Sequence, residues 1–103
     1  MDAISAIGLS GLTTASTRLQ VSASNLANMD DTASPAFVPT KAATVSLPQG
    51  GVQAQLSPAQ TGTEVDPASE AVDQVSALQQ YRASAALVAV DEKMKKSAID
   101  LLG

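Results

Sequence analysis

The residues that could carry acid–base, metal or phosphate chemistry in this sequence stand apart from one another. The adjacent carboxylates Asp30-Asp31 could hold a cation or transfer a proton, but no calcium-loop spacing follows them. Thr40-Lys41 has no phosphate-binding glycines before it, and no nucleotide-binding pattern surrounds Gly50-Gly51. Tyr81-Arg82 falls in the middle of an expected helix, where a half-buried ring beside a polar anchor is ordinary. The sequence therefore predicts no active site, and we do not expect an enzyme.

The composition excludes several further kinds of chemistry. The 103 residues include no cysteine and no histidine, which removes thiolate nucleophiles, the commonest general base and the commonest transition-metal ligand. We therefore expect no cofactor, no metal and no small-molecule substrate. The formal net charge of −4 argues against a nucleic-acid partner. The short cationic run of Lys93, Lys95 and Lys96 is expected near the C-terminal end of a helix, where it would complement the helix dipole.

The first residues resemble neither a cleaved secretory signal peptide nor a membrane span. Asp2 stands where a signal peptide carries basic residues, and polar side chains interrupt the apolar positions that follow. We therefore expect no cleaved signal and no direct membrane span.

A long and almost uncharged helix is expected at the N-terminus, because Arg18 is the only charged residue between Ala3 and Met29. The helix would cover about 27 residues and, being rich in Gly, Ser and Thr, would be marginal in isolation. Small residues on its seam would let another backbone approach closely. The seam, with the 3.5-residue repeat of a coiled coil, is formed by Met1, Ser5, Gly8, Leu12, Ala15, Leu19, Ser22 and Leu26.

Two asparagines, Asn25 and Asn28, come at the end of this expected helix. Asparagine tolerates the left-handed backbone that ends helices and bonds nearby backbone groups, so a helix-terminus role is expected for both. A turn over residues 29–35 follows. Short segments of strand character cover 41–47 and 52–56, with alternation that suggests a hairpin with one buried face, and the four residues 48–51 separate them. Such a hairpin, or loop, must lean on the helices or on a neighbouring molecule.

A second helix is expected over 67–102. Asp66 would be its N-cap, Pro67 its first residue, and Glu70 a favourable charge in its first turn. The stretch 83–90 is apolar on nearly every face, which is typical of a helix in a core or between several other helices. Asp91 and the lysines after it are expected to contact solvent and to form i to i+3 or i+4 pairs.

Together these elements predict one mainly α structural domain. The terminal helices, within 1–29 and 66–103, would pack as an antiparallel helical hairpin or coiled coil. The segment 30–65 would form a small β-hairpin or loop insert.

The ends of the two helices resemble the axial protein family of bacterial flagella, which includes rod and hook proteins. The first part of the resemblance is Asn25-Leu26-Ala27-Asn28, preceded by residues 19–24. The second is the segment 72–85, followed by residues 91–94. The sequence is most similar to the proximal rod protein of the FlgC type. It departs from the family in the turn over 30–35, in a shorter middle segment, and at Ser84, where the family often has Asn.

The resemblance implies a structural subunit of the flagellar basal-body rod that assembles through its terminal helices into a helical tube. It implies partners among its own copies, other rod proteins and the flagellar type III export apparatus, and a periplasmic location reached without a cleaved signal peptide. The alternative is a small soluble helical adaptor, or a reduced rod paralogue, that binds one protein partner through residues 83–90. The residues expected at subunit contacts are Leu12, Leu19, Ser24, Asn25, Leu26, Ala27, Asn28, Val75, Leu78, Tyr81, Ala85 and Val88.

Overall fold

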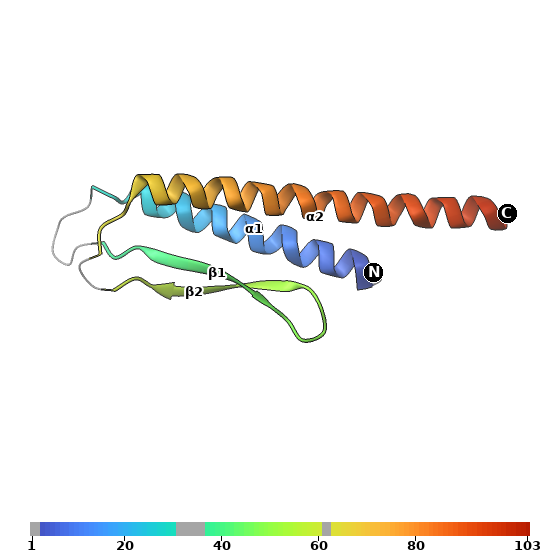
Figure 1. Ribbon diagram of the computed structural model, residues 1–103, viewed down its shortest axis with the longest axis horizontal. Coiled ribbons are helices and arrows are strands. Elements are labelled where there is room, and N and C mark those ends of the chain that lie inside the picture. The colour runs from blue at the N-terminus through green and yellow to red at the C-terminus, as the bar shows by residue number, and fades with distance from the viewer. Residues whose placement is uncertain (1–2, 31–36, 61–62) are drawn as a thin grey trace.

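The computed structural model describes residues 3–30, 37–60 and 63–103. Its elements, in chain order, are helix α1 (Ala3–Ala27), strands β1 (Thr40–Ser46) and β2 (Val52–Pro58), and helix α2 (Pro67–Leu102). The two helices run antiparallel and side by side, and the antiparallel β-hairpin comes between them in the chain (Figure 1). This confirms the predicted mainly helical fold and shows that the insert contains a true hairpin. Met1, Asp2 and residues 31–35 of the turn predicted over 29–35 lie outside the described residues.

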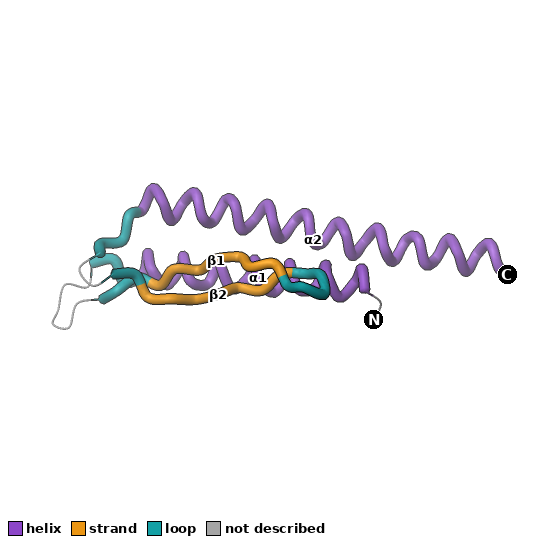
Figure 2. The backbone as a smooth tube through the Cα atoms, turned by 60° about the horizontal axis from the view of Figure 1, so that its bottom comes forward, coloured by secondary structure: helices purple, strands orange, loops and turns teal. Residues whose placement is uncertain are grey.

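Helix α1 is the inner element of the molecule. It packs against α2 on one side and against both strands on another, whereas α2 packs on neither strand (Figures 1 and 2). A helix covered on two sides has little surface to offer to charged groups, which explains why Arg18 is its only charge. Arg18 itself is used between the helices, since it donates to the Gln80 side chain at 2.7 Å and to Ser76 Oγ at 3.1 Å.

Glycines bring the two helices unusually close. A Cβ atom on Gly8 would lie 2.5 Å from Val88 Cγ2 and 3.3 Å from the Ser84 carbonyl oxygen, and one on Gly11 would lie 2.0 Å from Ser84 Oγ. The close approach that the small seam residues predict is therefore confirmed. The positions of α1 that are buried are Ser5, Gly8, Gly11, Thr14, Ala15, Ser22 and Asn25.

The hairpin is attached to α1 at its turn as well as at its base. Gly50 and Gly51 take the left-handed φ values of +98° and +86° that a non-glycine residue would find strained. Beside them the Val52 N–H donates to Ser10 Oγ at 3.1 Å, and Ser10 Oγ donates to the Ile7 carbonyl at 2.6 Å. The predicted buried face holds for Val52 and Ala54, which are half-buried, but Leu56 is exposed.

Helix α2 begins as its sequence predicts. Asp66 is the N-cap, with Oδ1 accepting from the Ala68 N–H at 3.0 Å and Oδ2 accepting from Ser69 Oγ at 3.0 Å, and Pro67 opens the first turn. The prediction for the lysines was wrong. No basic residue lies in the last turn of α2, and Lys96 is already more than one turn before its end at Leu102, too far to complement the dipole.

Asp91 also departs from its prediction. The residue is 4% exposed rather than in solvent, because it lies fourteen residues after Ala77 and therefore on the same, α1-facing side of α2. There it accepts a hydrogen bond from Ser5 Oγ of α1, and it pairs with Lys95 at 3.1 Å, as the i to i+4 spacing predicts.

This single chain buries small apolar side chains but leaves many large ones exposed. The buried hydrophobic residues of the described part are Ala15, Ala59 and Ala77, while Leu87 and Val90 of the apolar stretch 83–90 are exposed. The molecule measures 66 × 24 × 15 Å, with a radius of gyration of 17.9 Å against about 13 Å for a compact domain of this length. Its accessible surface is 7000 Å², against about 5,400 Å² for a compact monomer. The additional accessible surface follows from the thin, elongated shape of the molecule.

The close helix contact predicts an unusual response to a Gly to Ala change. Alanine is the better helix former by about 1 kcal/mol, yet Gly8→Ala should lower the free energy of unfolding by about 1–3 kcal/mol because its Cβ meets Val88 and a backbone oxygen. Urea unfolding followed by circular dichroism measures this. Gly103→Ala, where nothing lies within 4 Å, is the matched control. A Gly8→Ala chain as stable as the wild type would show that the helices are not packed this closely.

Candidate functional site

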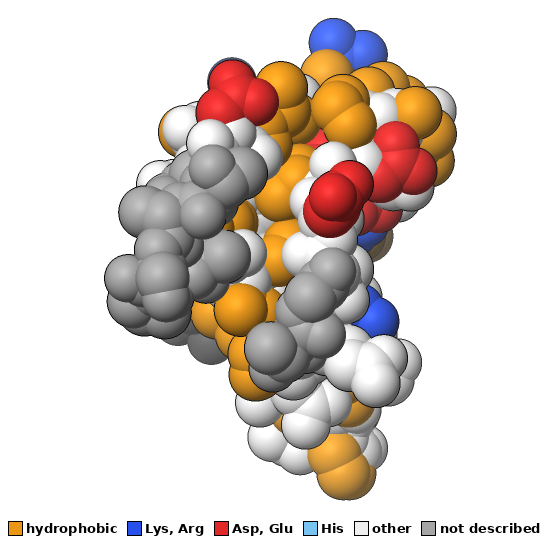
Figure 3. All heavy atoms as spheres, turned by 90° about the vertical axis from the view of Figure 1, so that its left-hand side faces the viewer, with side chains coloured by type: hydrophobic (Ala, Val, Ile, Leu, Met, Phe, Trp, Pro, Cys, Tyr) orange, Lys and Arg blue, Asp and Glu red, His pale blue; other side chains and the backbone are white. Residues whose placement is uncertain are grey.

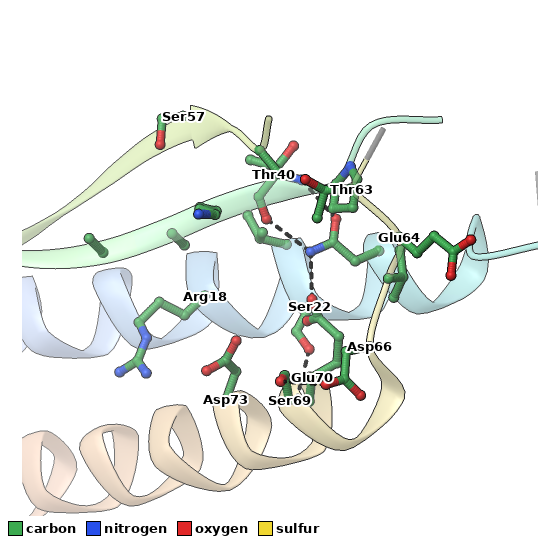
Figure 4. Close-up of a pocket in the computed structure, with 18 residues that line it drawn as sticks. Arg18, Ser22, Thr40, Ser57, Thr63, Glu64, Asp66, Ser69, Glu70 and Asp73 are labelled. Atoms are coloured by element: carbon green, nitrogen blue, oxygen red, sulfur yellow. Dashed lines mark hydrogen bonds between the residues drawn. The ribbon is translucent and has the colours of Figure 1, made fainter. Parts of the chain in front are cut away.

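The candidate site is a polar joint where the end of α1, the first residue of β1 and the first turn of α2 meet. We call it the asparagine joint and define it by Ser22, Asn25, Thr40, Glu70 and Gln74. Figure 4 shows Thr40 on the hairpin side and Glu70 on the α2 side, with α1 between them. All of its side chains that are buried have hydrogen-bond partners. The joint therefore sets how the three elements are oriented relative to one another.

Asn25 connects all three elements through one side chain. Its Nδ2 donates to the Thr40 carbonyl at 2.9 Å and to Glu70 Oε1 at 2.9 Å, and its Oδ1 accepts from the Thr40 N–H at 3.0 Å. The side chain thus pairs with both backbone groups of Thr40, as a neighbouring strand would. Only an amide provides two N–H donors and an acceptor on one short, uncharged side chain. The residue is 2% exposed, so a lost bond here could not be replaced by bulk water.

Ser22, one turn earlier on α1, fixes the same contact with α2. Its Oγ donates to the Glu70 carbonyl oxygen at 3.1 Å and accepts from Gln74 Nε2 at 3.2 Å. Together Ser22 and Asn25 hold the first two turns of α2 against the last two turns of α1. The register of the helices is therefore specified by polar bonds at this end, as it is by Ser5 and Asp91 at the other.

The two asparagines have different roles. Asn28 lies just beyond α1. Its side-chain Nδ2 donates to the Ser24 carbonyl oxygen at 2.8 Å, and its backbone N–H donates to the same oxygen at 3.1 Å. The predicted helix-terminus role of Asn28 is therefore confirmed. Asn25 lies inside α1 and faces other elements, so a helix terminus does not describe it. Sequence reasoning also missed Glu70 as its partner. The seven-residue spacing of Glu70, Ala77 and Asp91 could have placed both carboxylates on one face of α2.

A groove of about 530 Å³ opens beside the joint, between α1, β1, the segment before α2 and the first turns of α2 (Figure 4). Apolar side chains from each of these, including Val21, Ala42, Ala59 and Val65, line it, and Glu64 and Asp73 contribute carboxylates. Among the described residues no group of three or more His, Cys, Asp and Glu side chains could hold a metal ion. The chemistry that this groove can offer is binding of apolar and cationic groups.

The structure does not bring the predicted contact residues together in one site. Leu12 and Leu19 lie along α1, those from Ser24 to Asn28 lie at its end, where Asn25 alone belongs to the joint, and those from Val75 to Val88 are spread along α2. Their role as subunit contacts stays a prediction. The residue that is buried is Asn25; the half-buried ones are Leu12, Leu19, Leu26, Asn28 and Val88; the exposed ones are Ser24, Ala27, Val75, Leu78, Tyr81 and Ala85.

The joint predicts that the two asparagines differ in their response to substitution. Asn25→Asp replaces the donor with an acceptor that faces Glu70 and the Thr40 carbonyl, so we expect a loss of about 2–3 kcal/mol in the free energy of unfolding. Asn28→Ala, which removes one exposed bond, should cost about 0.5–1 kcal/mol. Urea unfolding measures both. Adding Glu70→Gln to the Asn25→Asp chain restores one donor and should recover part of the lost stability. If Asn25→Asp and Asn28→Ala lowered the free energy of unfolding equally, Asn25 would not have the connecting role described here.

Comparison with known families gives one match. Residues 6–34 match the family model described as Flagella basal body rod protein. No curated protein matches the chain. The matched residues include most of α1 and the segment from Asn25 to Asn28 that carries the sequence resemblance. The match supports the flagellar basal body rod family over most of α1, including Ser22 and Asn25.

Proposed function

We propose that this chain is a structural subunit of the bacterial flagellar basal-body rod and that it assembles through its two helices into a helical tube. The observation that carries the proposal is the family match over residues 6–34, because it falls on the element to which every other element is attached. In this proposal the asparagine joint sets the angle at which the hairpin leaves the helical pair, and so the shape that each subunit presents to its neighbours.

The surface of α2 supports an assembling role. Val72, Val75 and Val90 are all more than half exposed, and they lie on the side of the helix away from the α1-facing residue Ala77. Exposed apolar surface of this extent is typical of protein interfaces. The chain exposes about 1,600 Å² more accessible surface than a compact monomer of its mass would. This excess is similar in size to the area buried in one standard protein–protein interface.

The same thin packing supports the finer parts of the proposal. Because the buried hydrophobic residues of the described part of the chain are the small residues Ala15, Ala59 and Ala77, little free energy would oppose unfolding for passage through the flagellar type III export apparatus. We propose this route, without a cleaved signal peptide, to a periplasmic basal body, where other rod proteins and further copies are the partners. Within the family we propose the proximal rod, FlgC type. None of the described helices is long and apolar enough to cross a membrane.

A second function is favoured by the exposure of Leu87 and Val90 in the stretch 83–90. A small soluble helical adaptor, or a reduced rod paralogue, would use this part of α2 to bind a single protein partner. A defined one-to-one complex that forms without rod assembly would favour this function over the rod.

Deletion of the gene tests the rod proposal. We expect a strain without this chain to be non-motile and to lack rods in electron micrographs of isolated basal bodies, because a missing rod subunit interrupts the structure that carries the filament. Expression of the wild-type chain from a plasmid should restore both. Normal rods and swimming in the deletion strain would overturn the rod proposal.

A substitution on the outer face of α2 separates assembly from folding. Val75→Glu introduces a charge where we expect a neighbouring subunit, while leaving the contact with α1 untouched. The free energy of unfolding should change by less than about 0.5 kcal/mol, yet the variant should fail to restore motility to the deletion strain. Val75→Ala, which changes the same exposed position without adding a charge, is the matched control and should restore it. Full rescue of motility by Val75→Glu would show that this face of α2 is not a contact in the assembly.

A further inference from the structure

The main-chain hydrogen bonds of the hairpin decide which groups lie on its outer edges. Facing residues of an antiparallel pair alternate between pairs that exchange both main-chain bonds and pairs that exchange none. The Leu47 N–H donates to the Gly51 carbonyl oxygen at 3.0 Å, the Ala59 N–H donates to the Pro39 carbonyl oxygen at 2.8 Å, and the register between them is unbroken. Odd-numbered residues of both strands therefore bond within the hairpin, and the main-chain groups of even-numbered residues point outward.

On β2 these outward groups are free over one short segment. At the start of the strand the Val52 N–H is bound by Ser10 Oγ, and at its end Pro58 has no N–H. Between them lie Ala54 and Leu56, whose outward N–H and carbonyl groups bond no group that the structure describes. Figure 2 shows β2 on the side of the hairpin away from α2, which contacts neither strand. We call residues 54–56 the free edge.

The free edge lacks the features that keep exposed strands apart. Edge strands usually carry charged residues or proline, or are covered by another element, whereas β2 has no charged residue and its proline is terminal. The molecule does carry charge elsewhere, and Figure 3 shows acidic side chains around the end where α2 begins. Leu56 is 51% exposed, although its side chain lies on the same face of the hairpin as the half-buried Val52 and Ala54. An apolar side chain and unpaired main-chain groups therefore stand together on an open edge.

We propose that two copies of this chain pair antiparallel through their free edges, so that two hairpins form one four-stranded sheet. A two-fold axis through Gln55, perpendicular to the sheet, sets Ala54 of each copy opposite Leu56 of the other. Each of these two facing pairs exchanges two main-chain bonds, so every free group of the edge has a partner. The next bonding pair would be Val52 with Pro58, where one N–H is already bound by α1 and the other is missing. Two identical uncharged strands also meet without like-charge repulsion.

Leu56 of the second copy meets an apolar surface in this arrangement. A hollow of about 370 Å³ lies between α1 and the first half of β2, and Leu9 and Thr13 of α1 line it together with Val52 and Ala54. Leu9 is 46% exposed. Facing residues lie on the same face of a sheet, so Leu56 of the second copy, opposite Ala54, extends on the α1-facing side toward this hollow. The two-fold axis repeats the contact, and each copy covers exposed apolar surface of the other.

This pair goes beyond the proposed rod role. A two-fold contact closes on itself, whereas a tube needs a heterologous contact that repeats, so the contact joins free subunits and not subunits within a tube. A few main-chain bonds over a short edge make a smaller contact than the standard interface of about 800 Å² per copy. The pair can therefore exchange and release its subunits. Pairing also occupies an uncharged edge that could otherwise bind the strands of other chains.

Disulfide cross-linking of the full-length purified chain tests the contact and its register. The chain has no cysteine, so Gln55→Cys adds a single thiol at an exposed position. In the pair it meets its own copy across the axis at a Cα–Cα distance of about 4.5 Å, which a disulfide can span. In a glutathione redox buffer we expect covalent dimers on non-reducing gels at least about tenfold faster than for Gln53→Cys. Gln53→Cys is the matched control, because its thiols lie on the same face of β2 but more than about 13 Å apart in the pair.

Charges placed on the two edges identify the edge that binds. Adding Leu56→Lys to Gln55→Cys places a lysine from each copy beside the axis and should slow cross-linking at least about tenfold. Adding Thr44→Lys, at an exposed position on the outer edge of β1, should leave the rate unchanged. The rate of reaction with a small thiol reagent corrects for thiol exposure, and circular dichroism should show the same spectrum for all variants.

The proposal is overturned if Gln55→Cys links no faster than Gln53→Cys, or if Leu56→Lys leaves the rate unchanged. Slower linking with Thr44→Lys alone would assign the contact to β1 and would also overturn it. Cross-linking tests this contact alone, and the deletion strain tests the rod. A non-motile deletion strain with a chain that does not cross-link would retain the rod role and remove the paired hairpins. Cross-linking in a chain whose deletion leaves swimming intact would do the reverse.

Discussion

The side-chain amide of Asn25 uses both of its N–H groups and its oxygen at once, on two different elements of the chain. It binds both backbone groups of Thr40 and the carboxylate of Glu70, and the rest of the structure depends on this because little else could orient the parts. In most domains a shared apolar core fixes the angles between elements. Here the core of the described residues consists of alanines, so directional polar bonds take over that task.

The same division of roles runs along the whole helix pair. Polar contacts mark its two ends, from Asn25 and Glu70 at one to Ser5 and Asp91 at the other, and Gly8 and Gly11 allow close contact between them. Hydrogen bonds and close packing specify which residues face one another, but small side chains bury little apolar surface and so contribute modestly to stability. Large apolar side chains instead lie outside the pair. A chain built in this way has a defined shape and an incomplete set of contacts, which suits a subunit that is completed by its neighbours.

The sequence by itself determined the features that depend on near neighbours in the chain. Asp66 and Pro67 predict the start of α2, the alternation around Gly50-Gly51 predicts the hairpin, and Asn28 predicts the end of α1. Each of these results from bonds or backbone preferences within a few residues. The close helix contact could also be predicted, since only small residues recur on the seam of α1.

Only the tertiary structure decided what Asn25, Glu70 and Asp91 do. The partners of Asn25 are 15 and 45 residues away in the chain, and Ser5 and Asp91 are 86 apart. Local sequence preferences predict a helix stop for Asn25, a dipole partner for Glu70 and a solvated charge for Asp91. They predict these ordinary roles because they do not include what lies across the interface. Their actual roles follow from the rotation of a 36-residue helix about its axis and from its register against α1. Those two quantities are set by the packing of the complete chain, and they decide which polar side chains are buried.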